Sequence, residues 1–256
     1  MTFAAGGGIP LMDFTPNLKD QEGLQSGAQT FVNYCFGCHS MKYMRYGRLA
    51  DDLGIPRELV EENFIFNGSK VGALMKGSVP AKYQKQWFGA APPDLTLVSR
   101  ARGDKWLYTY LKSFYVDPSR PYGYNNLLFK DVGMPNVLQG LQGDQECAPA
   151  YVAGSHGRTK RDPITHEFIE SDSHGCGRAA HVKGTGELSP EEFDKLVSDL
   201  VSFLVYAGEP VKIYDRTFLG MDLSQREVYG VYSLLFLAFL GVFVYLLNRE
   251  YWKDIH

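Results

Sequence analysis

Residues 35–39 read Cys-Phe-Gly-Cys-His, and this pentapeptide restricts the chain more than any other part of its sequence. Two thiols three positions apart, followed directly by a histidine, form the attachment pattern of a c-type haem. In that pattern Cys35 and Cys38 can add to the two vinyl groups of the porphyrin, and His39 can then ligate the iron. We therefore expect one covalent haem c and a role in carrying electrons.

Other uses of a cysteine pair compete with this interpretation. A thioredoxin-like redox pair needs a βαβ context, and residues 27–34 and 40–46 show none. Structural zinc needs four ligands at a recognisable spacing, and no second CxxC or HxxxH follows. A chance pentapeptide is the third alternative. The specificity of the pattern favours haem attachment.

A run of twenty uncharged, mostly apolar residues lies near the C-terminus, at 228–247 (VYGVYSLLFLAFLGVFVYLL). At a rise of about 1.5 Å per residue a helix of this length spans roughly 30 Å, the thickness of a bilayer's hydrocarbon core. Aromatic residues flank both ends, as they do at membrane interfaces: Tyr229, Tyr232, Tyr245, Tyr251 and Trp252. A buried core helix would have to be apolar on all faces at the end of the chain. The run predicts a single transmembrane helix.

The charges around this run do not orient it, because basic residues lie on both sides. Covalent haem attachment normally takes place outside the cytoplasm, so we expect the large N-terminal part in the periplasm of a bacterial inner (cell) membrane protein. Residues 1–9 show neither a basic region nor a long apolar run, which favours a chain whose signal peptide has been removed.

The 256 residues are enough for one sizeable domain with extra segments. A net charge of −3 suggests no nucleic-acid partner. We divide the chain into an N-terminal arm (1–25), a periplasmic haem domain (26–210) with a polar insertion (about 142–183), a linker (211–227), the transmembrane helix (228–247) and a cytoplasmic tail (248–256).

The clearest helix signal in the haem domain begins at Ser189-Pro190-Glu191-Glu192, a capping box with proline at the first helical position. An apolar stripe with i, i+3, i+4, i+7 spacing follows, and Gly208 and Pro210 end it. This helix needs a partner. A helix beside the haem motif is the natural one, since Gly27 and Ala28 would allow close approach.

Other helices are predicted from about Gly27 into the haem motif, with Ser26–Gln29 as its capping box, over 51–66, and over 104–115. Residues 2–22 are predicted to be an extended arm, and 90–96 and 117–126 to be turns or loops. Strand signals are sparse. The sequence therefore predicts a mainly α fold.

Cys147 and Cys176 remain as an even pair within the polar insertion. In an oxidising compartment the default is a disulfide, and two free buried thiols are the alternative. Closing a loop of this size gains about 3–4 kcal/mol in the chain-entropy model.

The sixth ligand of the iron is less constrained. Met134 lies in Val-Gly-Met-Pro-Asn, where the following proline restricts the backbone and can present the side chain from a rigid loop. Met75 and a histidine are alternatives, while Met41 and Met44 follow the motif too closely to reach the far face. The remaining histidines of the polar segment are expected to face solvent: His156, His166, His174 and His181. A thioether ligand would favour ferrous iron and an electron relay over a peroxidase.

Long segments of the chain resemble the cytochrome c1 family of bc1 complexes (ubiquinol–cytochrome c oxidoreductases) in its proteobacterial form. They are FVNYCFGCHSMKYMRYGRLADDLGIP, WFGAAPPDLTLVSRARG, WLYTYLKSFYVDPSRPYGYNN, FKDVGMPNVLQGLQG, FDKLVSDLVSFLVYAGEP and NREYWKDIH. The resemblance implies a cytochrome c-like haem domain with long loops and one C-terminal transmembrane helix.

The resemblance also implies roles for particular residues. Cys35 and Cys38 would carry the thioethers, and His39 and Met134 would be the axial ligands. Arg102 would contact a haem propionate, as a fixed guanidinium suits a carboxylate. Pro92 and Pro93 would form a wall of the haem pocket. The polar insertion departs from the shorter loops of many relatives, and a Cys147–Cys176 disulfide would staple it near the Met134 loop.

For function, the resemblance implies that a neighbouring cytochrome b subunit oxidises quinol and that the Rieske iron–sulfur protein delivers one electron to this haem. The haem would pass it to a soluble or membrane-tethered cytochrome c, within a dimer of complexes bound to membrane lipid. The main alternative is a membrane-anchored subunit that feeds a haem–copper oxidase, although such subunits often place their anchor first. A haem peroxidase and a non-redox tether are further alternatives.

Overall fold

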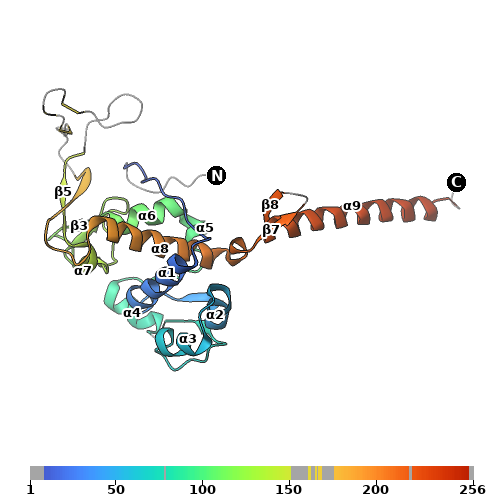
Figure 1. Cartoon of the computed structure of the whole chain (residues 1–256), viewed down its shortest axis with the longest axis horizontal. Coiled ribbons are helices and arrows are strands. Elements are labelled where there is room, and N and C mark those ends of the chain that lie inside the picture. The colour runs from blue at the N-terminus through green and yellow to red at the C-terminus, as the bar shows by residue number, and fades with distance from the viewer. Residues whose placement is uncertain are drawn as a thin grey trace. The chain divides into compact units, whose positions relative to one another are not determined.

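Helices dominate the computed structural model, and the strands form only short pairs (Figure 1). The structure describes residues 9–77, 79–150, 161–162, 165, 167–168, 176–218 and 221–253. The chain divides into two units, residues 1–208 and 209–256. The mainly α prediction is confirmed.

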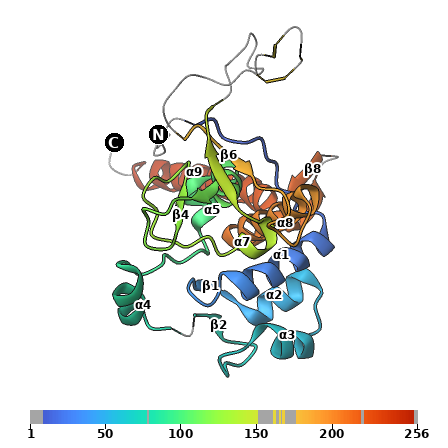
Figure 2. The same cartoon turned by 90° about the vertical axis from the view of Figure 1, so that its left-hand side faces the viewer.

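The first unit holds eight helices among its described residues: α1 (Gln21–Tyr34), α2 (Tyr46–Leu53), α3 (Arg57–Phe64), α4 (Ala81–Phe88), α5 (Val98–Arg102), α6 (Asp104–Lys112), α7 (Gln139–Gln142) and α8 (Pro190–Gly208). Its described strands form three antiparallel pairs: β1 (Met41–Arg45) with β2 (Leu74–Met75), β3 (Phe114–Val116) with β4 (Tyr124–Asn126), and β5 (Gln145–Ala148) with β6 (Arg178–His181). Figure 2 shows α2, α3 and the β1–β2 pair on one side of α1, with α5 and α8 on the other.

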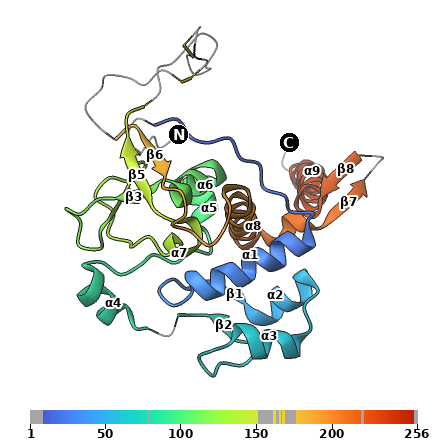
Figure 3. The same ribbon diagram turned by 60° about the vertical axis from the view of Figure 1, so that its left-hand side comes forward.

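Helices α1 and α8 pack against each other at the centre of this unit (Figure 3). A Cβ atom added at Gly27 would lie 2.2 Å from the Asp199 carbonyl oxygen, so only glycine allows this approach. Next to that contact the rings of Phe31 and Phe203, both fully buried, lie 5.8 Å apart between centroids. The predicted pairing of these two helices through Gly27 is confirmed.

The two helix starts show where local sequence rules succeed and fail. At α8 the capping box is present, because the Ser189 amide donates to the Glu192 carboxylate (2.9 Å) and the Glu192 amide donates to the Ser189 hydroxyl (3.3 Å). For α1 the predicted start near Gly27 is wrong. Asp20 caps the helix instead, since its carboxylate accepts from the Gly23 amide at 3.0 Å. Leu24 is buried, and its packing stabilises the additional helical turn before Gly27.

Two other predicted boundaries are corrected. The helix expected over 51–66 is two helices, α2 and α3, because Gly54 adopts the left-handed conformation (φ 63°) and Pro56 follows it. The helix expected over 104–115 ends at Lys112, and the chain continues as β3, whose partner β4 takes the last residues of the predicted 117–126 loop.

Strands β5 and β6 form the base of the polar insertion, with Cys147 opposite Ala179. A disulfide joins Cys147 to Cys176, whose Cα atoms lie 5.0 Å apart. The Gln145 side-chain amide donates to the carbonyl oxygens of Lys112 (2.8 Å) and Phe114 (2.7 Å), which fixes this base to the end of α6. Most of residues 151–175, including His156, His166 and His174, lie outside the described residues. His181 is exposed on β6, as predicted.

The second unit contains η2 (Pro210–Ile213), the antiparallel pair β7 (Asp215–Phe218) and β8 (Met221–Ser224), and α9 (Gln225–Tyr251). The segment predicted as a linker therefore contains a hairpin. Residues Glu227–Tyr251 are long and apolar enough to cross a membrane, and the structure buries none of the apolar 18-residue stretch within them. The large exposed side chains of α9 are those that a lipid environment would cover.

The α1–α8 contact gives a first prediction. Gly27→Ala should lower the free energy of unfolding by about 2 kcal/mol, because the new methyl group overlaps a backbone carbonyl that cannot rotate away. The loss should outweigh the gain of about 1 kcal/mol in helix propensity. Thermal unfolding of the full chain in detergent, followed by circular dichroism, measures the effect.

Gly140→Ala is the matched control, because Gly140 is also helical and a Cβ there meets nothing within 4 Å. It should raise the free energy of unfolding by up to about 1 kcal/mol, because only the gain in helix propensity applies there. Equal stabilities of the two variants would contradict the packing argument.

Candidate haem site

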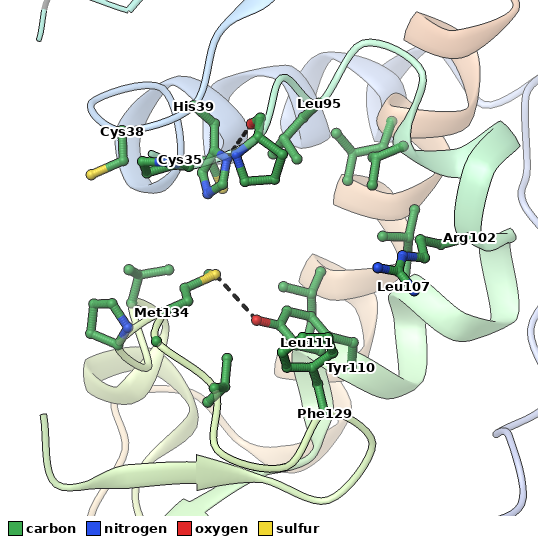
Figure 4. A pocket seen from close by; sticks show the side chains of 18 of the residues that line it. Cys35, Cys38, His39, Leu95, Arg102, Leu107, Tyr110, Leu111, Phe129 and Met134 are labelled. Carbon is green, nitrogen blue, oxygen red and sulfur yellow. Dashed lines mark hydrogen bonds between the residues drawn. The ribbon is translucent and has the colours of Figure 1, made fainter. Parts of the chain in front are cut away.

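Residues from five segments of the first unit line a cavity of about 390 Å³: 34–39, 88–98, 102–111, 129–137 and 200–204. Cys35, Cys38 and His39 lie on one wall, and Met134 lies on the wall that faces them (Figure 4). Leu200 and Leu204 of α8 also line the cavity, so the α1–α8 contact described above helps to shape it.

The haem motif directly continues the last turn of α1. The Cys35 amide donates to the Phe31 carbonyl (2.8 Å), and the His39 amide donates to the Cys35 carbonyl (2.8 Å). These bonds keep both thiols and the imidazole at the end of one helix. The thiols are not joined to each other, Cys35 being buried and Cys38 exposed. Burial, together with the nearby Cys38, raises the pKa of the Cys35 thiol to about 12, so the thiol is protonated at neutral pH.

One backbone hydrogen bond orients His39. Its Nδ1 lies 2.7 Å from the Pro93 carbonyl oxygen, which can only accept, so Nδ1 carries the proton. The unprotonated Nε2 is then the ring atom left for a ligand in the cavity (Figure 4). Burial lowers the pKa of His39, although the bond to Pro93 and the charge of Asp94 oppose this shift. The lowered pKa leaves the imidazole neutral at neutral pH, and the bond to Pro93 leaves Nε2 as its free nitrogen, which is the form that binds iron.

The loop that contains Pro92 and Pro93 is tied to the chain just after the motif. The Leu95 amide donates to the Ser40 carbonyl (2.9 Å), and the Lys42 amide donates to the Asp94 carboxylate (2.8 Å). Both prolines line the cavity. Pro93 thus has a second use that the sequence did not reveal, as the acceptor that sets the His39 tautomer.

The structure distinguishes between the two methionines considered as the sixth ligand. Met134 lines the cavity, and its sulfur accepts a hydrogen bond from the Tyr110 hydroxyl at 3.4 Å (Figure 4). Met75 is fully buried in β2 opposite Met41, and neither residue lines the cavity. Burial raises the pKa of Tyr110, so its hydroxyl is protonated and can donate. Met134 is therefore the methionine placed to face His39.

A row of side chains at spacing i, i+4 runs along one wall of the cavity. The Arg102 guanidinium lies 5.1 Å from the centre of the Trp106 ring, and that ring stacks on Tyr110 at 5.0 Å with an interplanar angle of 9°. All three residues line the cavity. Sequence reasoning found Arg102 but missed the site roles of Trp106 and Tyr110, although these residues follow Arg102 at successive intervals of four.

Trp106 provides a test of whether a haem fits. Its indole N–H is buried and has no hydrogen-bond partner in the described structure. An indole N–H can only donate, so an acceptor is missing beside the Arg102 guanidinium. A carboxylate at this end of the cavity would satisfy both groups. Thiols, an imidazole, a thioether and a pair of carboxylate-binding donors around one apolar cavity fit a c-type haem with its propionates.

Comparisons with known proteins agree with this chemistry. No family model matches the chain. It is 45% identical to a cytochrome c1 of Allochromatium vinosum, over 99% of this chain and 93% of that protein. It is 39% identical to an ammonia monooxygenase gamma subunit of Nitrosomonas europaea, over 93% of this chain and 85% of that protein. A cytochrome c1 of Rhodospirillum rubrum is 25% identical over 92% of this chain and 83% of its own length. With a relative this similar over nearly its whole length, the chain belongs to the cytochrome c1 family.

Proposed function

We propose that this chain is the haem c subunit of a cytochrome bc1 complex, and that it accepts one electron from a Rieske [2Fe–2S] protein and passes it to a c-type cytochrome. One observation carries the proposal: the His39 imidazole and the Met134 thioether face each other across an apolar cavity that the thiols Cys35 and Cys38 border (Figure 4). Membership of the cytochrome c1 family supports it.

In this proposal Cys35 and Cys38 hold one haem through two thioether bonds, and His39 and Met134 supply the axial ligands. A haem iron with these ligands changes between its ferrous and ferric states by one electron. Pro93 keeps Nε2 of His39 unprotonated and aimed into the cavity. The soft Met134 sulfur favours the ferrous state and occupies the position where oxygen chemistry would otherwise start.

The rest of the cavity wall supports electron transfer without substrate chemistry. Leu200 and Leu204 present an apolar surface, which keeps water out and disfavours the more highly charged ferric state. Arg102 and Trp106 supply donors for the haem propionates at one end. A disulfide between Cys147 and Cys176 closes the base of the insertion, and we assign it a structural role.

We further propose the setting of this chemistry. The helix α9 anchors the chain in a bacterial inner membrane, where its exposed apolar side chains contact lipid. Because haem is attached outside the cytoplasm, the first unit lies in the periplasm and residues 248–256 in the cytoplasm. The partners are a cytochrome b subunit, the Rieske protein and a soluble or membrane-tethered cytochrome c, within a dimer of complexes.

Covalent attachment can be tested by removing thiols. Cys35→Ser or Cys38→Ser should leave one thioether, and the pyridine haemochrome band should shift toward that of a b-type haem. The double variant should lose all haem that survives a denaturing gel. The double variant Cys147→Ser/Cys176→Ser is the control and should keep two thioethers. Full haem retention without Cys35 and Cys38 would contradict the proposal.

The sixth ligand can be tested with two matched substitutions. Met134→Leu should abolish the weak red absorption band that ferric iron shows with a thioether ligand, open the iron to carbon monoxide and lower the reduction potential. Met75→Leu conserves volume at a buried methionine outside the cavity and should leave all three properties unchanged. If Met134→Leu kept the band, Met134 would not be the ligand.

The complex itself can be tested by purifying the intact protein from its native membrane in mild detergent. A bc1 complex predicts a dihaem b-type subunit and a Rieske cluster in stoichiometric amounts. Copper with a high-spin haem in their place would identify a subunit of a haem–copper oxidase and overturn the assigned donor and acceptor.

A further inference from the structure

The Tyr110 hydroxyl donates a hydrogen bond to the sulfur of Met134, with 3.4 Å between oxygen and sulfur. Figure 4 shows the hydroxyl pointing at the sulfur from the side, while the Met134 side chain faces His39 across the cavity. A thioether sulfur is a weak acceptor with two lone pairs. The hydroxyl engages one of them and leaves the other for a ligand interaction.

Tyr110 is held in place independently of Met134. Its ring is stacked on Trp106 and forms a T-shaped pair with Phe114, at centroid distances of 5.0 and 5.2 Å. Its carbonyl oxygen accepts from the Asn126 side-chain amide at 2.8 Å. Both ring and backbone are thus fixed, and the direction of the O–H group follows from the packing of α6 against β3 and β4.

Asn126 also anchors the loop that carries Met134. Its side-chain oxygen accepts from the amides of Leu128 (2.9 Å) and Phe129 (3.0 Å), and its side chain is almost fully buried. One buried amide therefore fixes the starting point of the Met134 loop relative to Tyr110. The methionine side chain at the end of that loop is flexible, and the hydrogen bond from the Tyr110 hydroxyl fixes the position of its sulfur.

We propose that Tyr110 is a positioning residue for the Met134 thioether and that its hydrogen bond raises the reduction potential of the bound haem. The inference rests on the proposed function, in which Met134 is the axial ligand. A hydrogen bond withdraws electron density from sulfur and makes it a poorer donor. Ferric iron depends on that donation more than ferrous iron does, so the bond favours the reduced state.

Tyr110→Phe tests this, because it removes the hydroxyl and keeps the ring that packs on Trp106 and Phe114. A hydrogen bond contributes about 0.5–1.5 kcal/mol net, so the equilibrium between reduced and oxidised haem should shift by up to about two- to thirteenfold toward the oxidised form. At 59 mV per tenfold change for one electron, the midpoint potential should fall by up to about 20–65 mV. The thioether–iron absorption band should also move, because the sulfur becomes a stronger donor.

Tyr108→Phe is the matched control on the same helix. The Tyr108 hydroxyl accepts from Lys112 Nζ at 3.3 Å, and its ring stacks on Phe14 outside the cavity. Its removal should change neither the potential nor the band. A Tyr110→Phe protein with the potential and band of Tyr108→Phe, or with a higher potential, would overturn the inference.

Two further results separate this inference from the proposed function. If Met134→Leu kept the absorption band, the ligand assignment and this inference would both fall. If Met134→Leu lost the band but Tyr110→Phe resembled its control, only the role of Tyr110 would fall.

If Tyr110→Phe did not incorporate haem, the wild-type protein still decides the question. The ferrous full chain, labelled with ¹³C at its methionine methyl groups, should show a nuclear Overhauser effect between the Met134 methyl protons and a slowly exchanging tyrosine hydroxyl proton. Met75, outside the cavity, should show none. The absence of that contact from Met134 would overturn the inference.

Discussion

Helix α8 lies so close to α1 that one methyl group at Gly27 would overlap the Asp199 carbonyl oxygen, at 2.2 Å. This contact sets the crossing of the two helices, because interiors are close-packed and neither backbone can yield. It brings Phe203 against Phe31 and places Leu200 and Leu204 beside the end of α1. The thiols and the imidazole that continue α1 therefore face an apolar wall that a distant part of the chain provides.

The opposite wall depends on a second set of buried polar groups. Asn126 links the end of α6 to the start of the Met134 loop, and Gln145 links the β5–β6 base to the carbonyls that follow α6. Both side chains are buried, and their amides bond to backbone carbonyls at the end of α6 and the start of β3. Buried polar networks of this kind favour one arrangement of the segments that they join. The facing positions of His39 and Met134 thus result from helix packing on one side and from side-chain amides on the other.

Sequence rules found the parts of this architecture that depend on neighbours along the chain. The capping box at Ser189, the apolar run of α9 and the haem pentapeptide are each recognised from one continuous stretch of sequence. The start of α1 could not be fixed locally, because Ser26 and Asp20 both fit a cap and the burial of Leu24 decides between them. The short strands, the acceptor role of Pro93 and the direction of the Tyr110 hydroxyl all depend on partners distant in sequence.

In the proposed haem site, the row formed by Arg102, Trp106 and Tyr110 would influence the iron in two ways. At one end lie a guanidinium and an indole N–H that has no partner among the described residues, and at the other end a hydroxyl bonds to the thioether sulfur. A positive charge near the haem and a weakened sulfur donor both favour the ferrous state. Arg102 ends α5, whereas Trp106 and Tyr110 lie one turn apart on α6. Because the Trp106 and Tyr110 rings are stacked, a shift of α6 would move one propionate donor and the partner of the sulfur together. In the proposed site one face of α6 would thereby influence both the charge around the haem and the strength of its thioether ligand, which suits a carrier that must keep a single potential while its partners dock and leave.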